Sequence, residues 1–152
     1  MRVYGLGLCL LLALSAGCGN KTTEVANKPL VAVKGVITVN GEVPEWPILL
    51  SFANTGGGDT ANPTVSSAKT DENGNFEAGT YGIGDGLPAG SYAITATAIE
   101  YNTFLRRPVG PDKLGGKYEK ADKSPKKFEV KDGDQPIDLG TINLVGSKKK
   151  KK

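Results

Sequence analysis

Short apolar stretches with a period of two residues recur between residues 30 and 145. Alternate side chains of a β-strand point to the same face, so this period predicts strands with one buried face. The two clearest stretches are residues 48–53 and residues 91–99. Their apolar faces are formed by Ile48, Leu50 and Phe52 in the first stretch, and by Tyr92, Ile94, Ala96 and Ala98 in the second.

Turn-forming residues separate the predicted strands. Asn40-Gly41 ends a run rich in β-branched residues and predicts a tight turn. Asp71-Glu72-Asn73-Gly74 is expected to close a hairpin that turns Phe76 into the core, and Asp132-Gly133-Asp134 is expected to close another between residues 127–131 and 137–145. Gly140 is expected to mark a bulge, because the apolar residues on its two sides do not share one alternation.

These signals predict an all-β protein. Seven short strands in roughly 115 residues, with no helical pattern, indicate a single immunoglobulin-like or transthyretin-like antiparallel sandwich over residues 30–146. The chain contains 21 glycines and 9 prolines among 152 residues, which agrees with short strands joined by frequent turns.

The first residues follow a different pattern. Arg2 precedes an apolar run from Val3 to Leu14, which is too short to span a bilayer because a spanning helix needs about 20 residues. A short basic start, a short apolar run and an end in small residues describe a secretory signal peptide, expected over residues 1–17.

The end of this segment, Leu14-Ser15-Ala16-Gly17-Cys18, resembles the lipobox of bacterial lipoprotein precursors. In that family the peptidase cuts before the cysteine, whose thiol carries diacylglycerol and whose new amino group is acylated, for example with palmitate. The resemblance implies that Cys18 is the lipid-attachment residue and holds the domain on a membrane of the cell envelope, outside the cytoplasm. The sequence departs from the family at Ser15, where leucine is usual. The alternative is an ordinary secretory signal with an incidental cysteine.

Residues 18–29 are expected to form a flexible tether. They are polar and lack apolar periodicity, and Gly19 to Lys28 has an r.m.s. reach of roughly 17 Å as flexible coil. Removal of the signal peptide takes Cys9 with it, so Cys18 has no intramolecular partner and a disulfide scaffold is excluded.

Three motifs in the body resemble the carboxypeptidase regulatory-like, or transthyretin-like, domain family. They are Val36-Ile37-Thr38-Val39-Asn40-Gly41-Glu42, Thr70-Asp71-Glu72-Asn73-Gly74-Asn75-Phe76 and Leu87-Pro88-Ala89-Gly90-Ser91-Tyr92. The resemblance covers about residues 33 to 145, and the connection from Phe104 to Pro125 departs from it by its length. It implies an accessory or binding module without catalytic activity.

Charge excludes one class of partner. Of the 19 basic residues, Arg2 lies in the expected signal peptide and five form the tail Lys148 to Lys152. The rest of the chain is mildly acidic, which argues against nucleic acid as a partner. Residues 147–152 are expected to form a disordered lysine tail, and the alternative is attraction to anionic headgroups or acidic polysaccharide.

Few residues suggest catalytic or metal chemistry. The chain has no histidine, so Ser-His-Asp and Cys-His constellations are excluded and the commonest zinc ligand is missing. Asp71, Asn73 and Asn75 have the oxygen spacing of a calcium loop, but Gly82 stands where the final glutamate belongs. The glycine-rich residues 54–62 lack the helix and the Lys of a phosphate loop. We therefore expect no catalytic residue, no metal and no cofactor.

Three aromatic residues in or beside predicted loops, Trp46, Tyr81 and Tyr101, are candidates for stacking on a sugar ring. For Trp46 the alternative is packing over the end of the core. The leading hypothesis is therefore a membrane-anchored lipoprotein with a non-catalytic structural or protein-interaction domain. Its alternative is a carbohydrate-binding accessory lipoprotein, and a third hypothesis is an envelope enzyme. The partners expected are the membrane, through Cys18, and an envelope protein or polysaccharide.

Overall fold

The computed structural model of the chain describes residues 27–58, 61–102, 104 and 106–146. Its described part contains nine strands and one short 3-10 helix, η1. They are β1 (Val33–Val39), β2 (Leu49–Gly56), β3 (Ser66–Lys69), β4 (Asn75–Glu77), β5 (Gly90–Thr97), β6 (Glu100–Asn102), β7 (Arg107–Val109), η1 (Ala121–Lys123), β8 (Lys127–Val130) and β9 (Ile137–Leu144). No helix in these residues is long and apolar enough to cross a membrane.

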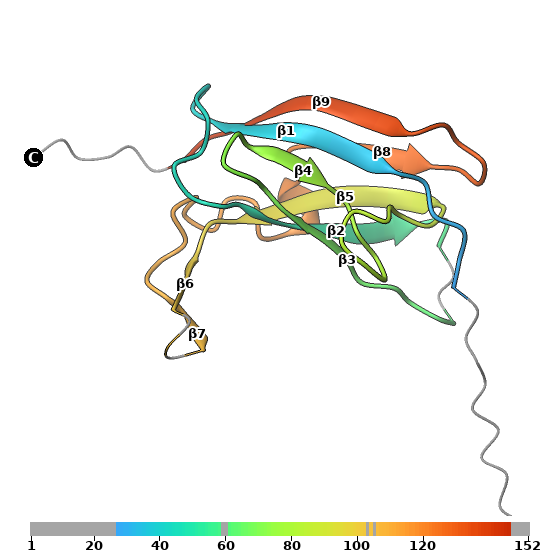
Figure 1. The fold of residues 1–152 in the computed structure, drawn as a ribbon, viewed down its shortest axis with the longest axis horizontal. Coiled ribbons are helices and arrows are strands. Elements are labelled where there is room, and N and C mark those ends of the chain that lie inside the picture. Colours follow the sequence, from blue (N-terminus) through green and yellow to red (C-terminus); the bar gives the residue numbers. More distant parts are fainter. Residues whose placement is uncertain (1–26, 59–60, 103, 105, 147–152) are drawn as a thin grey trace, which may run out of the picture.

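Seven of the strands form two sheets that face each other as a sandwich (Figure 1). One sheet has three strands in the order β4-β1-β9, and the other has four in the order β3-β2-β5-β8. This arrangement confirms the predicted all-β sandwich of about seven strands. The remaining strands, β6 and β7, pair with each other and form a hairpin outside both sheets.

One pair of strands corrects the prediction that all pairing is antiparallel. β1 and β9 run parallel, from the pair Val33 and Ile137 to the pair Val39 and Leu144. Parallel neighbours need a long crossover connection, and the chain between these strands supplies it by building the four-stranded sheet. Apolar alternation is the same in both directions of pairing, so the sequence pattern carried no signal for this feature.

The core lies between the two sheets and is made by the faces that the alternation predicts. The side chains on the predicted faces of residues 48–53 and 91–99 are all less than 5% exposed, and so is Phe76. The Phe52 ring centroid lies 6.2 Å from those of both Phe76 and Phe128, so aromatic contacts connect β2 with both sheets. The contact between Phe52 and Phe76 therefore stabilises the packing of one sheet on the other.

One predicted hairpin is confirmed only in part, and another is wrong in its pairing. Across the turn at Asp71, Ser67 and Gly79 exchange backbone hydrogen bonds of 2.9 Å, but β3 lies in the four-stranded sheet and β4 pairs with β1 in the three-stranded sheet. Likewise β8 pairs with β5 and β9 pairs with β1. The turns exist, but each carries the chain from one sheet to the other. A tight-turn sequence fixes a local reversal and does not decide in which sheet the next strand finds its partner.

Other local predictions are confirmed. Asn40 and Gly41 both have positive φ, 55° and 85°, as a two-residue type I′ turn requires, and Val39 and Glu42 exchange backbone hydrogen bonds across it. Gly140 has φ 67° and lies where the register between β1 and β9 shifts by one residue. The bulge therefore resets the alternation, so that Ile142 and Leu144 return to the core.

Candidate functional site

The end of the sandwich that carries the β6–β7 hairpin contains Trp46. This residue is half-buried and packs against the core, and its indole Nε1 is buried without an acceptor in the described residues. The ammonium group of Lys113 lies 4.7 Å from the centroid of the Trp46 ring, within the range of a cation–π interaction. One part of the ring thus faces the core and another faces a lysine.

Lys113 also forms an ion pair with Glu100, the first residue of β6. The hydrogen bond from Lys113 and its positive charge hold the pKa of the Glu100 carboxyl below its ordinary value. Trp46, Ile99, Glu100 and Val109 line a hollow of about 570 Å³ at this end. The residues around Lys113 therefore join the hairpin to the body of the domain.

A second group holds the chain beyond the hairpin. Asp112 accepts hydrogen bonds from the backbone N–H groups of Ala98, Leu114 and Gly116, at 2.7, 3.1 and 2.7 Å. Its carboxylate thereby brings the segment that follows the hairpin back to the end of β5. Leu114 is fully buried, so part of the long connection after β7 belongs to the core.

Tyr81 lies in a different part of the molecule. Its hydroxyl accepts a hydrogen bond of 3.0 Å from the backbone N–H of Lys28, and the side chain is 45% exposed. It lines an open groove of about 900 Å³ that runs along β3 and includes Leu49 and Ile83. The hydroxyl therefore helps to hold the chain where it enters the domain.

The loop that contains Tyr81 is organised by Asp85. Its carboxylate accepts backbone N–H groups from Thr80, Tyr81 and Gly82 at 2.7, 3.1 and 2.6 Å. These hydrogen bonds, that from Thr80 first, lower the pKa of Asp85. The carboxylate is thus committed to the shape of this loop.

The three stacking candidates are not gathered into one platform by the described residues. Trp46 and Tyr81 line separate hollows. Tyr101 pairs through its backbone with Pro108 in the β6–β7 hairpin, and its side chain lies outside the part of the chain that the structure describes. Sugar stacking by these residues therefore remains a prediction.

In the turn with calcium-like spacing, the carboxylate oxygens of Asp71 accept hydrogen bonds from within the turn. Asp71 accepts hydrogen bonds from the backbone N–H groups of Asn73 and Asn75, both at 2.8 Å, and from the side-chain amide of Asn75 at 2.9 Å. That side-chain hydrogen bond is the main cause that lowers the pKa of Asp71. Within the described residues, no group of three or more acidic or cysteine side chains could hold a metal ion.

The third motif of the sequence has a structural explanation in Tyr92. This residue is 2% exposed, and its hydroxyl donates a hydrogen bond of 2.8 Å to the carbonyl of Pro88, four residues earlier. The ring stacks on Phe128 with centroids 5.8 Å apart. Burial raises the pKa of the Tyr92 hydroxyl, so it stays protonated and donates throughout the physiological range.

The predicted anchoring residues lie elsewhere in the chain. The signal peptide 1–17, Cys18, most of the tether 18–29 and the lysine tail 147–152 are outside the described residues. The sequence reasoning also missed the contact of Lys113 with Trp46 and its ion pair with Glu100. A separation of 13 residues gives no local signal that Lys113 and Glu100 pair.

No family model matches the sequence, and no curated protein matches it significantly. Among solved structures, the fold is similar to part of the crystal structure of a 9R-lipoxygenase from Cyanothece PCC8801, with a TM-score of 0.37 and 19% identity. The match covers 82% of this chain and 18% of the lipoxygenase chain. A likeness at this level indicates neither a common family nor a common activity.

Proposed function

We propose that the chain is a lipoprotein of the bacterial cell envelope, anchored to a membrane by lipid on Cys18. In this proposal its β-sandwich is a carboxypeptidase regulatory-like domain with a structural or protein-interaction role outside the cytoplasm. The observation that carries the proposal is the lipobox-like sequence ending in Cys18, followed by a polar tether that leads directly into the sandwich.

The use of acidic residues supports a non-catalytic role. The carboxylates of Asp71, Asp85 and Asp112 each accept several hydrogen bonds from nearby N–H groups, all of them in turns and loops. Each of these carboxylates holds a loop, and the hydrogen bonds to Asp71 and Asp85 lower their pKa, whereas a general acid needs a raised pKa. The alternative is a carbohydrate-binding accessory lipoprotein. It would need one of Trp46, Tyr81 or Tyr101 to stack on a sugar ring alone.

Mass spectrometry of the mature protein tests the anchor. The N-terminus should be at Cys18 and should carry acyl mass, because two or more chains are needed for stable membrane attachment. Cys18→Ser should abolish lipid labelling and leave unprocessed precursor or a mis-cleaved soluble form. Cys9→Ser is the matched control, because it changes a cysteine inside the apolar run and should leave processing intact. An unmodified Cys18 thiol in the mature protein would contradict the proposal.

A further inference from the structure

The β6–β7 hairpin projects away from the sandwich (Figure 1). Its strands pair through Glu100 with Val109 and Asn102 with Arg107, and within the described residues they bond to no strand of either sheet. A hairpin of this size is marginally stable alone in water. It therefore depends on support at its base, and its tip is left free to contact something outside the domain.

The base of the hairpin has such support. Lys113 pairs with Glu100 at the start of β6 and lies over the Trp46 ring. The backbone N–H of Lys113 also donates a hydrogen bond of 3.0 Å to Ala98, just before β6. These contacts fix where the hairpin leaves the domain, so its tip is held out from the surface.

The tip combines an apolar ring with positive charge. Phe104 is 93% exposed, and Arg106 and Arg107 are both exposed. Arg106 has φ +50°, a left-handed conformation that glycine or asparagine adopts at less cost. The Phe104 ring is not buried by the described part of the domain, and the backbone at Arg106 is strained, so both observations point to a role outside the domain.

The charge of the hairpin indicates which kind of surface its tip contacts. Residues 101–111 contain two arginines and no acidic residue. At the base, Glu100 is neutralised by Lys113, and Asp112 is occupied by three backbone N–H groups. An aromatic ring flanked by arginines matches an anionic lipid surface, where the ring enters the interface and the guanidinium groups meet phosphates.

We infer that the β6–β7 hairpin is a membrane-contacting finger whose tip inserts Phe104 into the interface of an anionic bilayer. Burying the ring favours binding by roughly tenfold to a hundredfold. Each arginine near an anionic surface adds about fivefold. Such an affinity holds a freely diffusing protein only at high lipid concentration, whereas a short tether keeps the surface close at all times. The finger then orients an anchored domain, and in this respect the inference rests on the proposed lipid on Cys18.

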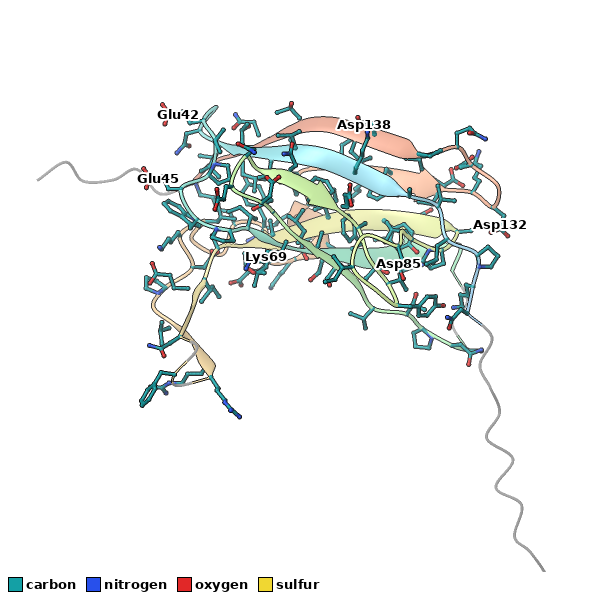
Figure 2. All side chains as sticks on the ribbon, in the orientation of Figure 1. Glu42, Glu45, Lys69, Asp85, Asp132 and Asp138 are labelled. Carbon is teal, nitrogen blue, oxygen red and sulfur yellow. The ribbon has the colours of Figure 1, made fainter. Side chains whose placement is uncertain are left out.

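Protection from trypsin tests the finger without relying on the anchor. The full chain carrying Cys18→Ser is mixed with vesicles containing phosphatidylglycerol, and cleavage after Arg106 is followed by mass spectrometry. Exposed hairpin tips are preferred sites of cleavage, and insertion should slow the reaction about tenfold or more. Cleavage after Lys131 is the internal control. Lys131 is next to Asp132, which lies at the end of the sandwich opposite Glu45 (Figure 2). The hairpin lies at the Glu45 end, so the two cleavage sites are at opposite ends of the domain.

Matched variants decide the outcome. Phe104→Ala and Arg107→Gln should lose the protection, Phe104→Leu should keep most of it, and phosphatidylcholine vesicles should give none. Ile83→Ala removes a fully exposed apolar side chain two residues from Asp85, which lies away from the hairpin (Figure 2), and should change nothing. Equal cleavage after Arg106 with and without anionic vesicles would contradict membrane contact by the hairpin. Protection of Phe104→Ala equal to that of the parent protein would contradict insertion of Phe104.

The lipidated protein separates this inference from the proposed function. If Cys18 carries lipid, the same protection should appear at a far lower lipid concentration than in Cys18→Ser. If both proteins need the same lipid concentration for protection, the result supports membrane contact by the hairpin and contradicts the lipid anchor on Cys18.

Discussion

Gly35 occupies a position in β1 where the neighbouring strands β4 and β9 of the same sheet leave no room for a side chain. A Cβ atom placed there would lie 2.9 Å from the Phe76 ring and 3.1 Å from the carbonyl oxygen of Gly140. Gly74 has φ +82°, and its Cβ would lie 2.3 Å from the carbonyl oxygen of Ile37. Gly35 and Gly74 therefore let β1 approach both the bulge at Gly140 and the turn at Gly74.

We predict that Gly35→Ala destabilises the domain by about 1–3 kcal/mol, the usual effect of an extra methyl group in a packed core. The Phe76 ring is 2% exposed and cannot move into solvent to relieve the contact. Urea unfolding of the variant and the wild type measures the difference. Gly56→Ala is the matched control, because a Cβ there meets nothing within 4 Å. Equal stability of Gly35→Ala and wild type would contradict the contact with Phe76.

At the scale of single elements, the loop between β4 and β5 shows how a carboxylate replaces regular structure. Asp85 supplies acceptors for three consecutive N–H groups that no strand satisfies. A carboxylate that accepts such hydrogen bonds is more acidic in the folded protein than in the unfolded chain. Its stabilising effect is therefore complete above the unfolded pKa and is lost as the pH falls through the lowered folded value.

We predict that Asp85→Asn lowers the urea midpoint at pH 7, because the amide turns a donor toward backbone N–H groups. Below the ordinary Asp pKa of 3.8, the difference from wild type should shrink as the wild-type carboxyl also becomes protonated. Urea denaturation of the variant and the wild type at pH 7 and below pH 3.8 measures this difference in midpoint. Asp132→Asn, at an exposed turn residue, is the control and should show no such convergence. A deficit of Asp85→Asn that is the same at both pH values would exclude the ionised carboxylate as its cause.

The elements differ in how far sequence could reveal them. The buried faces of β2 and β5 were predictable, because alternation is a local property. The partner of each strand was not, since the turn at Asp71 reads the same whether the chain returns to its own sheet or crosses to the other. The β6–β7 hairpin gave no strand signal because Pro108 and two adjacent arginines interrupt any alternation. The contact of Lys113 with Trp46 joins residues far apart in the chain, beyond the reach of any local pattern.

At the scale of the whole molecule, the first and last strands of the sandwich depend on each other. β1 is the central strand of its sheet, with β4 on one side and β9 on the other. β9 contributes Ile142 and Leu144, both less than 6% exposed, to the common core. The three-stranded sheet is therefore incomplete until the end of the domain has been added.

We predict that residues 28–146 fold on their own, since every strand of the described structure lies between them. Circular dichroism should show a β spectrum with one cooperative thermal transition. A fragment of residues 28–132 lacks β9 and should fail to melt cooperatively, because the edge of β1 and the core beneath it are exposed. A helical spectrum, or a non-cooperative melt of the longer fragment, would contradict the autonomy of the domain.

The parallel pairing of β1 and β9 also has a mechanical consequence. Because the two strands run in the same direction, the chain enters β1 at one end of the sandwich and leaves β9 at the other. A pull between the two ends of the domain therefore slides β1 along β9 and loads their hydrogen bonds in shear. The bonds share the force and must give way together, whereas the strands of a terminal hairpin would separate one bond at a time. With one end held and the other under tension, the domain resists extension along its strongest direction.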